Sequence, residues 1–267
     1  MAPRILFSHG NSFPAGTYRQ VLDSLRARGF EVLAIEKFGH DPKYPVTNNW
    51  PHLVQQLADA ARGWQEEGPP AFLVGHSLGG ILSLMCAARH PELARGVLLL
   101  DSPILSGWKA TTLGLVKKTQ MVGSLSPGRI SSKRRHHWPS RDAVLEHLRH
   151  KKAFAAWDPQ VLADYVDAGT HEREGQRWLS FDRDIETAIY NTLPDHLGSM
   201  LRRHPPKCPV AFIGGTHSVE MRTVGMDLTR QVTKGRVMML DGCHLFPMEK
   251  PLASAAAIEA SLRNMGA

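Results

Sequence analysis

Residues 71–85, AFLVGHSLGGILSLM, decide the fold of this chain. The apolar run at its start predicts a buried strand, and the run that follows Gly79 predicts a helix directly after a turn. The pattern Gly-x-Ser-x-Gly places Ser77 on that turn, as in a nucleophile elbow. Gly75 and Gly79 are small enough for a turn that pushes the Ser77 hydroxyl into the open. The stretch predicts an α/β fold with Ser77 as the candidate nucleophile.

Amides for an oxyanion hole are expected at the end of the first strand. Residues 4–14, RILFSHGNSFP, predict a short buried strand that enters a glycine-containing loop. A tetrahedral acyl intermediate carries negative charge on one oxygen, which preorganised backbone N–H groups stabilise. We expect the amides of Asn11 and Leu78 to form this hole, with Ser12 or Phe13 as the alternative to Asn11.

A general base is expected on the loop after the last strand. The run RVMML at 236–240 predicts that strand, and His244 follows it, two residues after Gly242. The chain has 14 histidines, so position rather than residue type selects His244 as the candidate base. His76 is next to Ser77, but a neighbouring side chain points away from the hydroxyl, and we expect His76 to have a packing role.

These motifs, in this order, resemble those of an α/β-hydrolase-fold serine hydrolase. They are His9-Gly10, Gly75-His76-Ser77-Leu78-Gly79-Gly80 and Gly242-Cys243-His244. The stretches 11–18 and 244–249 are similar to those of bacterial, esterase-like hydrolases, and the resemblance covers nearly the whole chain. It implies acyl-transfer chemistry at a serine.

The acid that orients the base departs from the usual pattern of that family. The resemblance implies an aspartate in the loop after the next-to-last strand, but Ser218 stands there, and a serine cannot stabilise an imidazolium. Glu220 in the same loop and Asp101 at the end of an earlier strand are the two candidates. We favour Asp101, because it follows Ser77 by one helix and one strand and so reaches the same edge of the sheet.

Alternating strands and helices predict a three-layer α/β-hydrolase fold with a mostly parallel sheet of about six strands. The strands are expected at 4–8, 31–36, 71–74, 97–100, 209–213 and 236–240. Amphipathic helices are expected near 17–28 and after Pro51. The chain begins at the strand that feeds the oxyanion loop, so we expect the sheet to lack the hairpin that usually opens this fold.

Strands and helices stop alternating over residues 103–206, and this segment predicts an inserted helical cap. Ser140 and Asp158 are typical N-cap residues and precede amphipathic runs. Because the segment leaves after one strand and returns before the next, we expect it to rise over the edge that carries the nucleophile and to filter substrates. The predicted hydrolase core is then 1–102 and 207–267.

Composition and charge limit the class of protein. Of the 267 residues, 42% are apolar and 21% are charged, as in a globular domain, and no apolar run is long enough to cross a membrane. The net charge is +7, but no aromatic-rich strand or recognition-helix pattern accompanies the densest basic stretch, 129–138, as a nucleic-acid-binding site would require. We expect it to be a solvated loop or to attract anionic substrates. Three scattered cysteines are too few for a disulfide framework or a zinc cluster.

The expected compartment is the cytoplasm, because the N-terminus enters a strand within four residues and leaves no room for a signal peptide. The expected partner is a small-molecule ester, with no nucleic acid and no membrane, and the sequence leaves a homodimer open. The chemistry requires no metal or organic cofactor.

The expected activity is hydrolysis of a small or medium apolar acyl ester through an acyl-enzyme. His244 would take the proton from Ser77 while Asp101 orients the imidazole. The same groups could cleave a thioester or a carbon–carbon bond between carbonyls. Two other classes stay open: a lyase in which Ser77 and His244 relay protons, and a ligand-binding receptor with low turnover.

Overall fold

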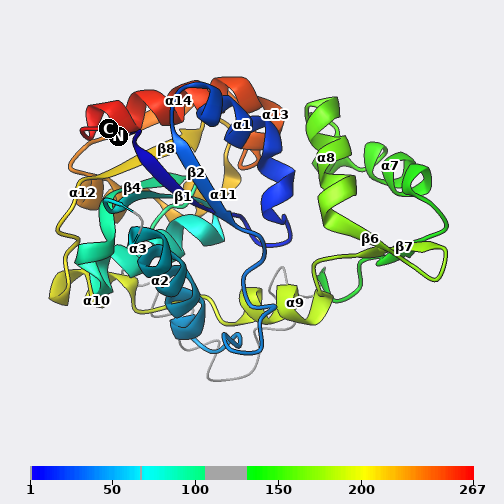
Figure 1. Cartoon of the computed structure of the whole chain (residues 1–267), viewed down its shortest axis with the longest axis horizontal. Coiled ribbons are helices and arrows are strands. Elements are labelled where there is room, and N and C mark those ends of the chain that lie inside the picture. The colour runs from blue at the N-terminus through cyan, green and yellow to red at the C-terminus, as the bar shows by residue number, and fades with distance from the viewer. Residues whose placement is uncertain (1, 67, 106–130) are drawn as a thin grey trace.

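The computed structural model describes residues 2–66, 68–105 and 131–267, and its central sheet has six parallel strands in the order β2-β1-β3-β4-β8-β9 (Figure 1). The strands are β1 (Arg4–Ser8), β2 (Glu31–Ile35), β3 (Ala71–His76), β4 (Ala94–Leu100), β8 (Val210–Gly215) and β9 (Val237–Leu240). The predicted six-stranded sheet is confirmed. Among the described residues, no helix combines the length and the apolarity that crossing a membrane requires.

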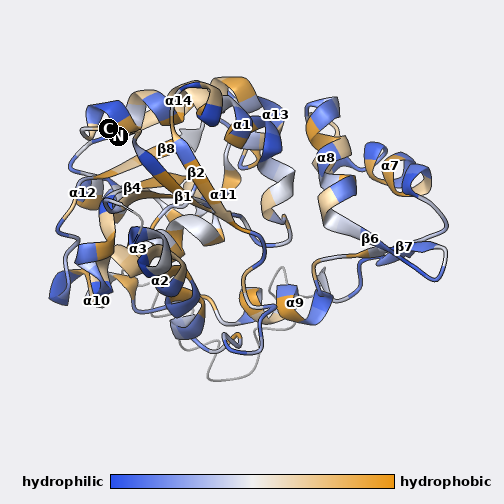
Figure 2. Ribbon diagram, viewed as in Figure 1, coloured by the Kyte–Doolittle hydropathy of each residue, from blue (hydrophilic) through white to orange (hydrophobic). Residues whose placement is uncertain are grey.

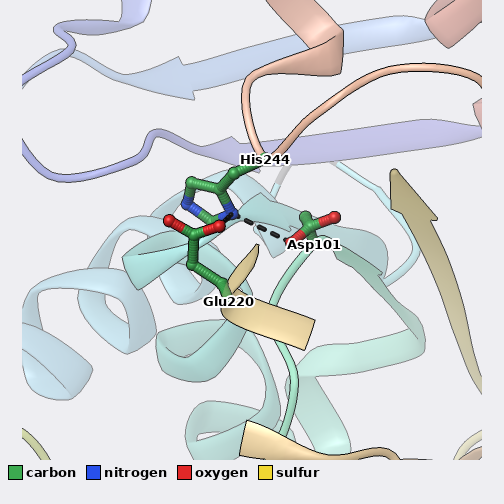
Figure 3. Close-up of side chains that lie close together, drawn as sticks. All are labelled: Asp101, Glu220 and His244. Carbon is green, nitrogen blue, oxygen red and sulfur yellow. Dashed lines mark hydrogen bonds and ion pairs between the residues drawn. The ribbon is translucent and has the colours of Figure 1, made fainter. Parts of the chain in front are cut away.

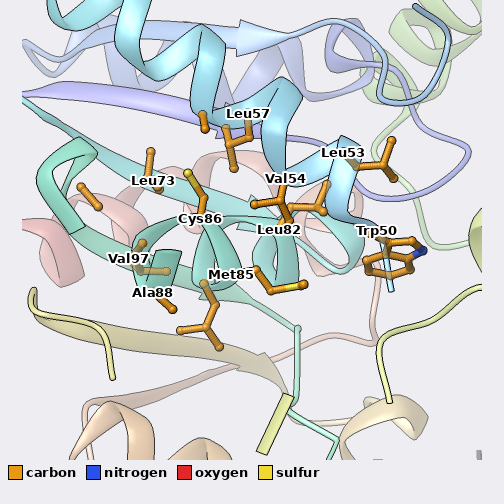
Figure 4. Packing of buried hydrophobic residues seen from close by; sticks show 14 of the residues in the cluster. Trp50, Leu53, Val54, Leu57, Leu73, Leu82, Met85, Cys86, Ala88 and Val97 are labelled. Carbon is orange, nitrogen blue, oxygen red and sulfur yellow. The ribbon is translucent and has the colours of Figure 1, made fainter. Parts of the chain in front are cut away.

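Two layers of helices cover the sheet because successive strand residues point to opposite faces. The covering helices are α1 (Arg19–Ala27), α2 (Pro51–Gln65), α3 (Leu78–Arg89) and α14 (Pro251–Asn264). Leu6 and Leu73 pack with residues of α2 and α3 in one hydrophobic cluster. Figure 4 shows Leu73 of this cluster together with Leu57 of α2 and Leu82 of α3. Phe7 and Phe72 pack with residues of α1 and α14 in a second cluster on the other face. Each fully buried side chain of this size contributes about 1.5–3 kcal/mol of transfer free energy.

The helix predicted near 17–28 is two elements in the structure. A 3-10 turn, η1 (Ala15–Tyr18), precedes α1, which ends before Gly29 in the left-handed region at φ 88°. The helix expected after Pro51 is α2, with that proline in its first turn. The remaining short elements of the core are η2 (Pro91–Leu93), α11 (Val219–Val224), α12 (Asp227–Thr233) and α13 (Phe246–Glu249).

The segment between β4 and β8 is called the insertion (residues 103–206), and 106–130 lie outside the described residues. Its described elements are β5 (His137–Trp138), α7 (Arg141–Arg149), η3 (Lys152–Phe154), α8 (Pro159–Gly169), β6 (Thr170–Arg173), β7 (Gln176–Leu179), α9 (Arg183–Asn191) and α10 (Leu197–Arg203). Helices α7 and α8 begin at the N-caps predicted from sequence: Ser140 accepts a hydrogen bond from the Ala143 amide, and Asp158 accepts one from the Gln160 amide.

The insertion also contains a three-stranded antiparallel sheet, β5-β7-β6, in a segment predicted from sequence to be helical. Strands β6 and β7 form a hairpin whose turn residues, Glu174 and Gly175, both have positive φ, at 53° and 71°. Figure 2 shows these two strands as hydrophilic. They therefore lack the apolar alternation by which strands are predicted.

The insertion leaves the main sheet at the carboxyl end of β4 and joins it again at the amino end of β8. β4 and β8 are neighbours in that sheet, so the chain leaves one strand and returns along the next. Helix α8 contacts η1, α1 and α13 (Figure 1). Its Tyr165 belongs to the same hydrophobic cluster as Phe7. The insertion and the core thus pack against each other near the loops that follow the parallel strands.

Three glycines let the start of α3 lie against the strands. A Cβ on Gly75 would lie 2.2 Å from the carbonyl carbon of Gly79, and one on Gly79 would lie 2.1 Å from the carbonyl oxygen of Ser8. A Cβ on Gly80 would lie 2.1 Å from the Ser102 hydroxyl oxygen. The first turn of the helix can approach β1, β3 and Ser102 only without side chains at these positions.

Substituting Gly75 by alanine should therefore destabilise the fold. We expect Gly75→Ala to lower the free energy of unfolding by about 1–3 kcal/mol or more, because backbone atoms must move to admit the methyl group. The control is Gly63→Ala at an exposed position of α2, where an added Cβ meets no atom within 4 Å, and we expect a gain of about 0.5–1 kcal/mol from helix propensity. Urea denaturation measures both, and equal stabilities for the two variants would contradict the packing argument.

Candidate active site

Ser77 lies on the turn between β3 and α3, in the strand-turn-helix arrangement predicted from sequence. Its backbone has φ 52° and ψ −113°, an unusual conformation for a residue with a side chain. The Ser77 amide donates to the Leu100 carbonyl oxygen at 3.0 Å, and the Ser77 carbonyl accepts from the Gly80 amide at 3.1 Å. These bonds and the close packing at Gly75 hold a turn that costs on the order of 1–3 kcal/mol.

His244 lies on the loop after β9 and contacts Ser77 directly. Its Nε2 is 3.0 Å from Ser77 Oγ, and its Nδ1 is 2.9 Å from Asp101 Oδ1. A carboxylate only accepts, so the Nδ1–H donates to Asp101 and Nε2 is left to accept the serine proton. The loop can pass this close to β8 because Gly215 has no side chain: a Cβ there would lie 2.3 Å from the Cys243 carbonyl oxygen.

Asp101 is fully buried at the end of β4 and accepts three hydrogen bonds. His244 Nδ1 and Ser218 Oγ donate to its Oδ1, the latter at 2.6 Å, and the Gly215 amide donates to its Oδ2 at 2.7 Å. The Asp101 amide donates to the Ile213 carbonyl oxygen, and its φ is 42°. Ser218, which stands where the resemblance implies an aspartate, thus supports the carboxylate that comes from the earlier strand.

Glu220, the alternative acid, lies near the same imidazole but makes a weaker contact (Figure 3). Its Oε2 is 3.9 Å from His244 Nδ1, and half of its side chain is exposed, against none for Asp101. The ligand atoms of the three side chains lie within 4.8 Å of one another, a spacing that metal sites also use. The 2.9 Å hydrogen bond from His244 to Asp101 accounts for the closeness of two of the three side chains. The geometry therefore favours Asp101 as the partner of His244.

The candidate oxyanion loop follows β1, and hydrogen bonds distinguish its four amides. The Gly10 amide donates to the Tyr18 hydroxyl at 2.9 Å, and the Phe13 amide donates to the Gly10 carbonyl oxygen at 3.2 Å. Within the described part of the chain, the amides of Asn11 and Ser12 have no such acceptor. Phe13, one of the sequence-based alternatives, is thus disfavoured because its amide is already engaged.

Leu78 supplies the other expected amide from the first residue of α3. The first amides of a helix have no acceptor within the helix, and the helix dipole places partial positive charge there. The assignment of Asn11 and Leu78 to an oxyanion hole stays a prediction, to which the structure adds that the Asn11 side chain is anchored. Asn11 Nδ2 donates to the Glu186 carbonyl oxygen of the insertion at 3.1 Å.

His76 has a role beyond the packing predicted from sequence. Its Nε2–H donates to the His244 carbonyl oxygen at 2.9 Å, and its Nδ1 accepts from the Tyr18 hydroxyl at 2.7 Å. Tyr18 in turn accepts from the Gly10 amide. Burial and the neighbouring His244 lower the pKa of His76 to about 3, so the ring is neutral with one N–H, as this chain of bonds requires. These hydrogen bonds join the oxyanion loop, the elbow and the histidine loop.

Cys243 and Glu249 support the same histidine loop. Cys243 donates to Glu249 through both its amide, at 3.1 Å, and its thiol, at 2.7 Å. Burial and the hydrogen bond to Glu249 raise the pKa of Cys243 to about 12, so the thiol stays protonated. Cys243 is therefore suited to holding the loop and unsuited to acting as a nucleophile.

A cavity of about 390 Å³ opens onto Ser77 and His244. Asn11 lines it from the core, and Lys152 and Tyr190 line it from the insertion. Burial, and then the nearby Glu186 carboxylate, raise the pKa of Tyr190, which keeps its phenol neutral. Sequence reasoning missed Tyr190, because no motif marks a tyrosine of the insertion as part of the site.

The basic stretch 129–138 contributes one residue to a buried ion pair. Residues 129 and 130 lie outside the described residues. Arg134 donates to Glu186 Oε2 at 2.9 Å and to the Tyr165 hydroxyl at 2.8 Å. Its side chain is only 19% exposed, so the expected solvated loop is wrong for this arginine.

The chain is similar to known proteins over nearly its whole length. The family model described as the alpha/beta hydrolase family matches residues 5–257. A serine hydrolase-like protein of Dictyostelium discoideum is 23% identical over 94% of the chain and 72% of that protein. The monoglyceride lipase of Rattus norvegicus is 28% identical over 48% of the chain, and the match spans only 45% of the lipase.

Among solved structures, that of E-2-(acetamidomethylene)succinate hydrolase has a TM-score of 0.76 at 19% identity, covering 98% of this chain and 92% of that one. The thioesterase domain from the curacin biosynthetic pathway has a TM-score of 0.73 at 21% identity, covering 97% and 91%. At these identities the similarity shows the shared fold.

Acid should destabilise the protein through two buried histidines. Burial lowers the pKa of His9 to about 4 and that of His76 to about 3, against an ordinary value of 6.5. The unfolded chain binds these protons first, so stability is retained above pH 6.5 and falls as the pH drops toward 4 and 3. Each histidine contributes a slope of up to about 1.4 kcal/mol per pH unit.

Urea denaturation at a series of pH values from about 8 to about 4 measures this slope. We expect His9→Gln to reduce it, and His52→Gln, on an exposed position of α2, to leave it unchanged. A slope that does not depend on His9 would contradict the assignment.

Proposed function

The chain belongs to the alpha/beta hydrolase family, and from that premise we propose that it is a serine hydrolase that cleaves carboxylic esters through an acyl-enzyme. One observation carries the proposal. Two hydrogen bonds, of 3.0 and 2.9 Å, link Ser77 Oγ through the His244 imidazole to the buried Asp101 carboxylate. The serine of this chain lies on a strained turn that faces a cavity.

Acylation begins with proton transfer from Ser77 Oγ to His244 Nε2 as the oxygen attacks the ester carbonyl. Asp101 stabilises the imidazolium that forms and keeps the Nδ1 proton in place. The amides of Asn11 and Leu78 hold the oxyanion. When the tetrahedral intermediate collapses, His244 gives its proton to the departing alkoxide, which leaves as an alcohol.

Deacylation repeats the sequence with water as the nucleophile. His244 Nε2 takes a proton from the water, whose oxygen attacks the acyl carbonyl. Collapse breaks the bond to Ser77 Oγ, which regains its proton from His244, and the acid product leaves. The hydrogen bond from His76 to the His244 carbonyl holds the histidine loop through both halves of the cycle.

The substrate we propose is a small or medium apolar acyl ester. The cavity of about 390 Å³ has the size of a small-molecule site and is lined in part by Phe13, Ala156 and Leu245. Relatives carry the names of a lipase, a thioesterase and a succinate-derivative hydrolase, so the bond that is cleaved varies among proteins of this fold. The same groups could also cleave a thioester, and we choose the ester because several matched proteins are named monoglyceride lipases and a monoglyceride is an ester.

The triad can be tested by hydrolysis of p-nitrophenyl esters from acetate to octanoate. We expect Ser77→Ala to lower kcat to the background, a loss of about 10⁶ in enzymes of this chemistry. Asp101→Asn should lower kcat by about 10⁴, because the amide favours the wrong imidazole tautomer. Glu220→Gln is the matched control, since it removes a carboxylate 3.9 Å from the same nitrogen, and we expect kcat to stay within about threefold of the wild-type value.

A collapse of activity only in Glu220→Gln would assign the acid to the later loop. If the wild-type protein hydrolyses none of these esters, the proposal fails. Failure of Ser77 to react with a fluorophosphonate would then point to a lyase, and stabilisation by a ligand without turnover would point to a receptor.

Ser218 should contribute to catalysis through Asp101. Ser218→Ala removes a 2.6 Å hydrogen bond to the carboxylate, and bonds of this charged kind are worth about 1.5–3 kcal/mol. We expect kcat to fall about tenfold with KM nearly unchanged, because the imidazolium forms only on the way to the transition state. Ser218→Thr keeps the hydroxyl and should retain most of the activity. Equal kcat for Ser218→Ala and the wild type would show that Ser218 serves only as the N-cap of α11.

A further inference from the structure

Glu186, on α9 of the insertion, accepts hydrogen bonds from the loop that carries the candidate oxyanion amides. Its carboxylate Oε1 accepts a hydrogen bond from Ser12 Oγ, and its backbone carbonyl accepts one from Asn11 Nδ2 at 3.1 Å. Glu186 is almost completely buried, with 4% of its surface exposed. One residue of the insertion therefore binds both loop residues whose amides are unengaged.

Arg134 fixes the Glu186 carboxylate from the other side. It donates to Oε2 at 2.9 Å and also to the Tyr165 hydroxyl at 2.8 Å. A buried carboxylate requires such a partner, since without one its charge would be strongly unfavourable. The Tyr165 ring packs against Phe13, with centroids 5.5 Å apart, so a second element of the insertion holds the end of the same loop.

Ser12 needs this support because its φ is 78°, in a region that favours glycine. Such conformations persist where surrounding contacts determine them. The contacts of the Ser12 side chain therefore control the direction of the peptide groups at Asn11 and Ser12. An oxyanion donor is effective only if it points at the place where charge develops.

We propose that Glu186 is a positioning residue, which holds the Asn11–Ser12 turn in the conformation that aims its amide at the oxyanion. The proposal rests on the proposed hydrolase function. Neither Glu186 nor Arg134 lines the cavity at Ser77, so both act through the loop rather than by touching the substrate. The insertion thus does more than cover the site: its buried ion pair sets the geometry of the oxyanion hole.

The direction of this amide should affect the stability of the transition state more than that of the bound substrate. Loss of one oxyanion donor lowers kcat by about 10²–10³, so a misdirected donor should lower it by about 10–100-fold. KM should change little, because the carbonyl oxygen of the substrate carries little charge. A trifluoromethyl ketone, which forms a tetrahedral oxyanion with a serine, should lose affinity by the same factor as kcat.

The experiment compares three variants on p-nitrophenyl butyrate and with an alkyl trifluoromethyl ketone. Ser12→Ala removes the hydroxyl that donates to Glu186 and that also lies within hydrogen-bonding reach of Tyr190. Glu186→Gln leaves Ser12 and Tyr190 in place and removes only the charge that pairs with Arg134.

The control is Asp164→Asn, which neutralises another buried carboxylate between insertion and core. Asp164 accepts hydrogen bonds from Arg19, Gln20 and Gln160, which lie outside the oxyanion loop.

We expect Ser12→Ala and Glu186→Gln to lower kcat by about 10–100-fold, to raise the Ki of the ketone in parallel, and to leave KM within about threefold. Asp164→Asn should leave all three within about threefold. If Ser12→Ala and any folded Glu186→Gln keep wild-type kcat and Ki, the positioning role is refuted, even where their thermal stability falls. If the wild-type protein neither hydrolyses the ester nor binds the ketone, the proposed function fails and this inference fails with it.

Discussion

The buried carboxylate of Asp101 joins the loops that follow β4, β8 and β9 at the carboxyl edge of the sheet, where the site lies. It lies at the end of β4 and accepts hydrogen bonds from the end of β8, from Ser218 in the next loop, and from His244 after β9. Its own amide donates to the Ile213 carbonyl of β8. Without this carboxylate, three buried or half-buried donors would lose their acceptor, at a cost of about 1–3 kcal/mol for each one left unpaired. The same group thus organises three loops and orients the candidate base.

Much of the fold and the centre of the site followed from local patterns. Fully apolar strands such as β1 and β3 produce clear signals, and the carboxyl ends of parallel strands meet at one edge, so residues placed just after them come together. This is why Ser77 and His244, far apart in the sequence, could be paired in advance. The choice between Asp101 and Glu220 could not be settled that way, because both reach the edge, and burial separates them: one is fully enclosed and the other is half exposed.

The supporting contacts were beyond sequence reasoning for physical reasons. Ser12 and Glu186 are 174 residues apart, and neither stands in a pattern with the other. The bonds that join Gly10, Tyr18 and His76 depend on one hydroxyl that contacts both the loop after β1 and the end of β3. The small sheet of the insertion is made of short polar strands, whose hairpin turn uses Glu174 where asparagine or aspartate would have signalled it. Contacts of this kind come from tertiary packing and leave no periodic trace.

The position of the insertion has a consequence for how such a chain can change. Because it joins two neighbouring strands, segments of different length or sequence could replace it without altering the register of the sheet. Such a replacement would change the residues that line the cavity. It would also remove Glu186 of α9, which accepts hydrogen bonds from Ser12 and Asn11. A transplanted segment must bring its own acceptors for those two side chains. In this chain the insertion and the loop after β1 therefore have to be exchanged as one unit.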